Sequence, residues 1–141
     1  MLRTLVVAAL LVAPVLAGSQ VDQYVPTDAE RARWTIKDMN DWAIVLQAYH
    51  KDNNHYPEAA GIDELIAKVQ PVYIRVAPSH DAWGNEYSYT ATGDSSSCSL
   101  VSAGSDGQFS PAQPQEAARL ANFDDDAVVQ DGKLFRGWEF R

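Results

Sequence analysis

The chain has 141 residues, of which 46% are hydrophobic and 21% are charged. This is the composition of a folded globular protein, and the length suits one domain of ordinary size. The formal net charge of −8 excludes nucleic acid as an expected partner, because phosphate binding requires a basic surface, whereas it suits the binding of cations.

The N-terminus has the pattern of a secretory signal peptide. One early charge, Arg3, precedes an apolar run over residues 5–17 that ends in small residues before Gly18. The run is shorter than the roughly 20 residues that span a membrane. We therefore expect residues 1–17 to be removed on export to the periplasm or the extracellular space, leaving a polar lead-in over 18–26. The alternative is an uncleaved membrane anchor, and only then would the membrane be a partner.

A capping box predicts the start of a long helix. The side chains of Thr27 and Glu30 can each accept a hydrogen bond from the other residue's backbone N–H. Apolar residues at helical spacing then continue to about Asp52. They form one stripe, made of Ile36, Met39, Trp42, Ala43, Val45, Leu46 and Tyr49. We expect Lys37, Asp38, Asp41 and Gln47 to face away from it.

Turn residues and short elements follow the helix. Asn53, Asn54 and Pro57 are typical of a helix end, and residues 61–69 are predicted to form a second, short helix. A hairpin is predicted from the strand-like runs on either side of residues 92–97.

A second hairpin is predicted around Asp131 and Gly132, a dipeptide typical of tight turns between strands. The polar stretch over 110–122 is expected to be a loop with room for one helical turn. Because the chain offers no second long helix, the apolar stripe needs a sheet to pack on. The predicted fold class is therefore α+β, a single domain over 27–141 in which a long N-terminal helix packs on a small antiparallel sheet.

Four short motifs follow one another along the chain: DNNHYP (52–57), DAWGNEY (81–87), SAGSDG (102–107) and DDD (124–126). In this order they resemble the globular C-terminal domain of the major, G-type pseudopilin of type II secretion systems. The resemblance implies a pseudopilin-like head with a calcium-binding C-terminal loop, a non-catalytic role in protein secretion, and secretion-system or pseudopilus proteins as partners.

The resemblance also implies which residues hold the calcium ion, because the family wraps it between the SxGxDG loop and the late acidic cluster. Carried over by position, the carboxylate ligands are Asp106, Asp124 and Asp126, with Asp125 as a substitute, and backbone oxygens near Ala103, Asp125 and Val128 complete the shell.

The chemistry of these residues agrees with calcium. Calcium takes about 6–8 oxygen ligands, and a bound cation would cancel the repulsion among three adjacent aspartates. Zinc would favour Cys and His, but Cys98 is the single cysteine, and His50, His55 and His80 show no paired spacing. The alternative for the three aspartates is a solvated acidic turn.

The start of the chain departs from the family pattern. A pseudopilin keeps its apolar segment after cleavage, and that segment anchors the subunit and packs inside the filament. Here the apolar run precedes the expected cleavage point. The sequence therefore predicts an exported head without the polymerising segment. The alternative is a divergent, membrane-anchored major pseudopilin that assembles into a pseudopilus.

A small exported hydrolase is the remaining alternative. Such an enzyme needs a nucleophile and a base in a recognisable arrangement. The serines of residues 94–99 resemble a polar turn, His50 lies near a helix end, and Cys98 has the setting of a small buried residue. We therefore expect no catalytic activity. Trp83 is expected to be a half-buried structural anchor.

Cleavage of the signal peptide gives the first testable prediction. Protein recovered from the exported fraction should begin at Gly18, as read by N-terminal sequencing or intact mass. A mature protein that retains the apolar run would instead support the membrane-anchored alternative.

Overall fold

The computed structural model describes residues 23–110 and 117–140. They form, in chain order, α1 (Asp28–Asn53), α2 (Ile62–Val69), β1 (Ser88–Ala91), β2 (Cys98–Ser102), β3 (Ala118–Leu120), β4 (Ala127–Gln130) and β5 (Lys133–Trp138). The α+β class is confirmed. The signal peptide expected over 1–17 lies outside the described residues.

The strands form one sheet in the order β1-β2-β4-β5-β3. Both predicted hairpins are present, β1 with β2 and β4 with β5, and β2 pairs with β4, all antiparallel. The prediction of a wholly antiparallel sheet is wrong at one edge, because β3 pairs with β5 in parallel. β3 also replaces part of the loop expected over 110–122. Only one of its three residues, Leu120, places an apolar side chain in the core, so the sequence has no alternating pattern that would predict a strand here.

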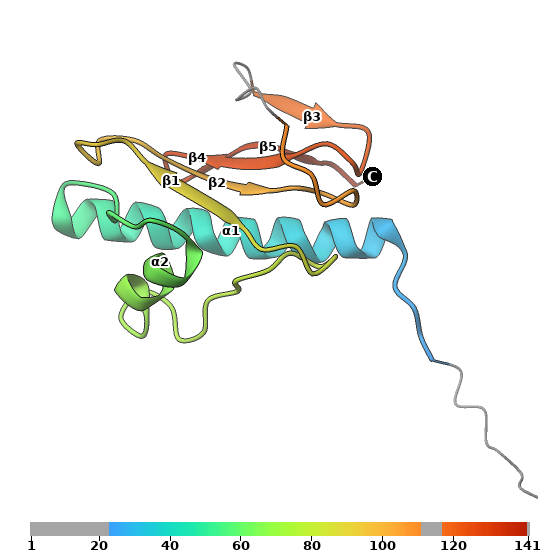
Figure 1. Ribbon diagram of the computed structural model, residues 1–141, viewed down its shortest axis with the longest axis horizontal. Helices are drawn as coiled ribbons and strands as arrows, with labels where there is room; N and C mark the ends of the chain where they lie inside the picture. The colour runs from blue at the N-terminus through green and yellow to red at the C-terminus, as the bar shows by residue number, and fades with distance from the viewer. Residues whose placement is uncertain (1–22, 111–116, 141) are drawn as a thin grey trace, which may run out of the picture.

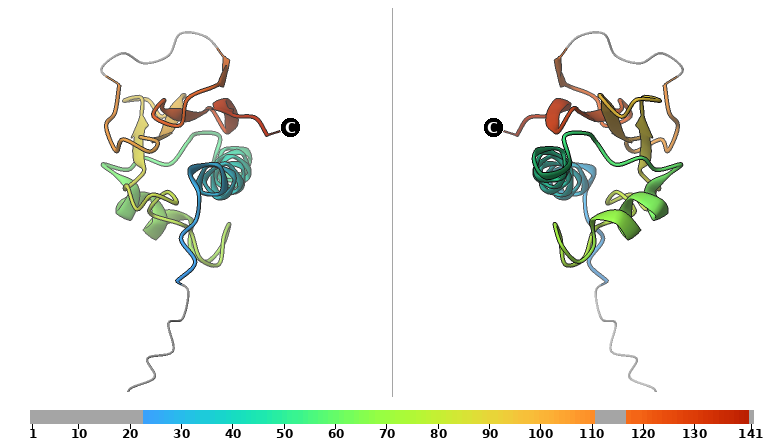
Figure 2. Two further views of the ribbon diagram at one scale, coloured as in Figure 1. Left: turned by 90° about the vertical axis from the view of Figure 1, so that its right-hand side faces the viewer. Right: turned by 90° about the vertical axis from the view of Figure 1, so that its left-hand side faces the viewer.

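The sheet lies along one side of α1, as Figure 1 shows. Figure 2, which looks along the helix, shows the sheet above α1 and α2 below it. α1 packs mainly on β4 and β5, while α2 contacts β1. The centre of the core is formed by fully buried side chains from all three layers: Met39, Trp42 and Leu46 of α1, Leu65 and Val69 of α2, and Leu100 and Val129 of the sheet.

The ends of α1 follow the sequence prediction. The Thr27 hydroxyl accepts a hydrogen bond from the Glu30 backbone N–H, and the Glu30 carboxylate accepts one from the Thr27 backbone N–H. At the other end Asn54 adopts the left-handed conformation and its N–H donates to the carbonyl of His50. Local hydrogen bonding therefore sets both ends of the helix.

The β4–β5 turn lies directly against α1. Asp131 and Gly132 both have positive φ, at 49° and 70°. A Cβ atom on Gly132 would lie 2.5 Å from Cγ of Gln47 and 3.3 Å from the carbonyl oxygen of Ala43. Gln47 is exposed, as predicted for the polar face of the helix, but its side-chain amide also reaches this turn and donates to the Gly132 carbonyl.

Gly132→Ala is expected to destabilise the domain by about 2–3 kcal/mol, since alanine is strained at this φ and its methyl group would overlap α1. Urea unfolding measures the change. Gly93→Ala is the matched control, because no atom lies within 4 Å of a Cβ placed at Gly93. Equal unfolding free energies for the two variants would contradict the close packing of this turn on the helix.

Candidate functional site

Asp81 organises the first part of the site. Its side chain is buried, with 5% of its surface exposed. One carboxylate oxygen accepts hydrogen bonds from the backbone N–H groups of Trp83 (3.0 Å) and Asn85 (2.9 Å), and the other accepts one from the Ser102 hydroxyl (2.7 Å). The DAWGN turn is thereby fixed to the end of β2.

Asn85 links the DAWGN turn to the SAGSDG loop. Its amide nitrogen donates to the carbonyl of Gly104 at 2.8 Å. A Cβ atom on Gly107 would lie 2.8 Å from the amide oxygen of Asn85, so the loop passes close to this side chain. Both glycines have positive φ, which side-chain-bearing residues rarely adopt. The second and third sequence motifs are therefore one structural unit.

The same loop lies against the turn that carries the three aspartates. The backbone N–H of Ser105 donates to the carbonyl of Phe123 at 2.7 Å, and the Ser105 hydroxyl donates to the Asp124 carboxylate. A Cβ atom on Gly104 would lie 2.4 Å from the Phe123 carbonyl oxygen and 2.9 Å from that of Asp125. Only a glycine permits so close an approach, and it brings two acidic segments that are distant in the sequence side by side.

Asp106 and Asp126 are the two carboxylates that interact across this contact. Asp106 is exposed, and its carboxylate accepts from the Gln108 N–H at 2.9 Å. Asp126 is buried, with 7% of its surface exposed, and one of its oxygens accepts from the Ser110 N–H at 2.7 Å. Burial raises the pKa of the Asp126 carboxyl, and the negative charge of Asp106 raises it further, while the bonds from Ser110 oppose both.

The second oxygen of Asp126, Oδ1, is buried and has no hydrogen-bond partner among the described residues. A buried acceptor left without a partner costs roughly 1–3 kcal/mol, and more when it is charged. Oxygen donors of this kind are what calcium prefers. The residues present therefore fit a hard cation at Asp126, and the Asp106 carboxylate adds a negative charge that acts on the same group.

The other candidate ligands occupy different settings. Asp124 and Asp125 are exposed, Ala103 is buried at the end of β2, and Val128 lies within β4. Val128 is paired with Val101 on one side and with Arg136 on the other. Over residues 23–110 and 117–140, no three His, Cys, Asp or Glu side chains are grouped so that they could hold a metal ion.

Two tryptophans connect this site to the start of α1. The Trp83 indole N–H donates to the Asp28 carboxylate at 2.8 Å, and the Trp83 ring packs edge-on against Trp138 with centroids 5.5 Å apart. The Trp138 indole N–H donates to the carbonyl of Asn122 at 2.8 Å. Trp83 is half-buried, so the prediction of a structural anchor is confirmed.

Cys98 is buried as predicted, with 2% of its surface exposed. Burial raises the pKa of its thiol to about 12, which keeps the thiol protonated at neutral pH and unreactive. His50 packs on the ring of Tyr56, with centroids 4.5 Å apart. Cys98 is thus a buried packing residue, and His50 packs on an aromatic ring.

Sequence reasoning missed Asp81 and Asn85 as organisers of the site. Their spacing around Gly84 resembles an ordinary turn, in which aspartate and asparagine bond their own backbone. Asp81 and Asn85 bind Ser102 and Gly104, which lie about twenty positions further along the chain, so no local sequence pattern predicts these contacts.

Comparison with known proteins gives one family match. A family model described as type II secretion system (T2SS), protein G, matches residues 21–121. No curated protein and no solved structure matches the chain. The matched range ends before the three aspartates at 124–126. Within the described residues, no helix combines the length and the apolar character needed to cross a membrane.

Asp81→Asn is expected to lower the free energy of unfolding by about 2–3 kcal/mol, because the amide cannot replace both charged acceptor oxygens. Chemical denaturation measures the change. Asp63→Asn removes the same charge from the exposed first turn of α2 and should cost no more than about 0.5 kcal/mol. If Asp81→Asn were as mild as the control, Asp81 would not be the organising residue.

Proposed function

The chain belongs to the family of type II secretion system protein G, the major pseudopilins, and from this premise we propose that it is a non-catalytic structural and binding module of protein secretion, stabilised by calcium. Pseudopilins act at the cell envelope, which agrees with export of this chain to the periplasm or beyond. Its partners in this role are secretion-system or pseudopilus proteins. Calcium supplies a divalent charge that joins the two acidic segments.

One observation carries the calcium proposal. Asp126 places a carboxylate oxygen in a buried position without a hydrogen-bond partner among the described residues, next to the loop that bears Asp106. In the absence of a cation, Asp106 and Asp126 carry charges of the same sign, so their repulsion opposes folding of this end of the domain. A divalent ion would reverse the sign of that interaction.

Asp106 and Asp126 are the side-chain ligands that we propose first. Asp124 and Asp125 lie on the same turn but are exposed, so they would serve at the rim of the site. Since the described carboxylates alone do not form a group of three, oxygens of the backbone and of water would complete the shell that calcium requires. The backbone of residues 103–105 passes close enough to the acidic turn to contribute.

The proposed consequence is mechanical. A cation shared by Asp106 and Asp126 would tie the ends of the intervening segment together and hold β3 and its flanking residues against the sheet. Because the ion binds the folded state and not the unfolded chain, its binding free energy adds to stability. The domain would then present a fixed surface to its partners.

Family membership itself favours a second candidate, a membrane-anchored subunit that assembles into a pseudopilus. The same calcium-stabilised head would serve in either case. The identity of the mature N-terminus separates the two, as set out for Gly18 above. Because the family is structural, the hydrolase alternative gains no support from it.

Calcium is expected to raise the melting temperature of the domain. At a free concentration one hundred times Kd it adds about 2.7 kcal/mol, or roughly 10 °C for a domain of this size. Circular dichroism melts in calcium and in excess chelator measure the shift. Asp126→Asn and Asp106→Asn should each remove most of it, and Asp63→Asn should leave it intact.

The proposed calcium site would be wrong if the wild-type protein melted at the same temperature in calcium and in chelator. It would be misplaced if calcium still stabilised both Asp126→Asn and Asp106→Asn as strongly as the wild type.

A further inference from the structure

Arg136 of β5 lies near Asp126, the residue that precedes β4. Arg136 of β5 is paired directly with Val128 of β4. Ala127 and Val129 belong to the hydrophobic core, and Val128, which lies between them in β4, points to the other face of the sheet together with Arg136. Asp126 lies just before β4, two positions ahead of Val128. The long side chain of Arg136 brings its charge near Asp126, and this charge acts on the Asp126 carboxyl.

The two side chains present complementary unpaired atoms. Nε of Arg136 and Oδ1 of Asp126 are both buried without a hydrogen-bond partner among the described residues. The positive charge of Arg136 lowers the pKa of Asp126, in opposition to burial and to Asp106. The ion pairs found in the described ranges do not include these two groups, so they act on each other without direct contact.

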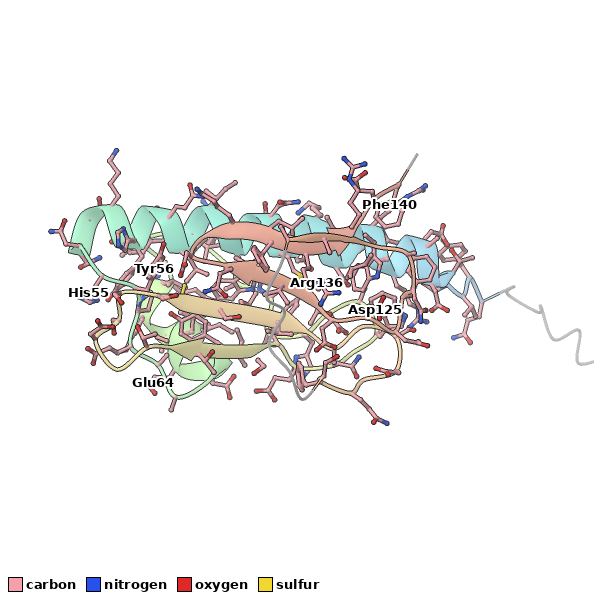
Figure 3. All side chains as sticks on the ribbon, turned by 90° about the horizontal axis from the view of Figure 1, so that it is seen from above. His55, Tyr56, Glu64, Asp125, Arg136 and Phe140 are labelled. Atoms are coloured by element: carbon pink, nitrogen blue, oxygen red, sulfur yellow. The ribbon has the colours of Figure 1, made fainter. Side chains whose placement is uncertain are left out.

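Figure 3 looks onto the sheet and shows Arg136 on it, with Asp125 at the end where the acidic turn lies. The Asp126 carboxyl thus has a negative neighbour, Asp106, and a positive one, Arg136. A cation bound to Asp126 and Asp106 would therefore be repelled by Arg136. Without a cation, the same arginine partly neutralises the buried carboxylate.

We propose that Arg136 is the counter-ion of Asp126 in the absence of metal and that it competes with calcium for this carboxylate. The inference rests on the calcium site proposed above. Arg136 lowers the affinity for calcium and keeps the acidic turn folded when calcium is removed. The domain thus tolerates low calcium, and the ion adds stability without being indispensable for folding.

The test uses charge-changing variants of Arg136. Arg136→Gln removes the charge, Arg136→Lys keeps it, and Arg136→Met is a second neutral variant that retains the aliphatic stem. Arg119→Gln is the matched control, because Arg119 is an exposed residue of the neighbouring strand β3 that pairs with Glu139. Circular dichroism establishes that each variant is folded.

Isothermal titration with calcium is the first measurement. Removing a positive charge that acts on the calcium-binding carboxylate is expected to tighten binding about tenfold in the two neutral variants. Arg136→Lys and Arg119→Gln should bind within about threefold of the wild type. Equal affinity in the neutral variants and in Arg119→Gln would overturn the competition.

A double-mutant cycle in excess chelator is the second measurement and needs no calcium. Arg136→Gln should lower the melting temperature in the wild-type background and should have little effect in the Asp126→Asn background. An equal loss in both backgrounds would overturn the counter-ion role.

The two measurements separate this inference from the calcium proposal. If the neutral variants bind calcium and the wild type does not, competition by Arg136 is supported and the calcium dependence of the natural chain is rejected. If no variant binds calcium, both the calcium site and the competition are rejected. If the wild type binds and the neutral variants bind no tighter, only the role of Arg136 is rejected.

Discussion

The carboxylate of Asp81 joins its own turn to the end of β2, about twenty positions further along the chain, and the C-terminal end of the domain depends on this contact. It accepts from two backbone N–H groups of its own turn and from Ser102 at the end of β2. Asn85, held by this turn, then binds the carbonyl of Gly104. Without this buried acceptor, two backbone N–H groups and the Ser102 hydroxyl would lose a partner at once, and the loop that bears Asp106 would lose its support.

Packing extends this constraint to the rest of the domain. Trp83, from the same turn, binds Asp28 at the start of α1 and packs on Trp138 of β5. Trp138 in turn binds the backbone of Asn122, just before the acidic turn. A continuous chain of contacts therefore links the start of the long helix to the aspartates near the C-terminus. Stabilising the acidic turn should also stabilise the start of α1.

Among the described residues, the buried aspartates Asp81 and Asp126 have different hydrogen-bond surroundings. Asp81 has its charge met by protein donors, whereas Asp126 keeps one oxygen without a donor in the described part of the chain. A closed hydrogen-bond network is suited to structure, and an open one beside like and unlike charges is suited to ion binding. Asp81 therefore holds a fixed contact, whereas Asp126 keeps an acceptor that the proposed calcium ion would use.

The sequence by itself determined the features that depend on neighbouring residues. The capping box of Thr27 and Glu30, the apolar stripe of α1 and the Asp131-Gly132 turn each involve contacts within a few positions, and local rules describe them well. The order of the four motifs was enough to indicate the family and the fold class.

Tertiary structure alone decided the rest, because the deciding contacts join residues far apart in the chain. Three successive aspartates look alike in sequence, and only the folded chain shows that Asp126, next to β4, is buried while Asp124 and Asp125 are exposed. β3 is too short to carry a pattern, and it exists as a strand because β5 offers it an edge. Gln47 is exposed, as its sequence position suggests, and only the tertiary structure shows that its amide also binds the hairpin turn. Burial and pairing depend on which segments meet, and that information is spread over the whole fold.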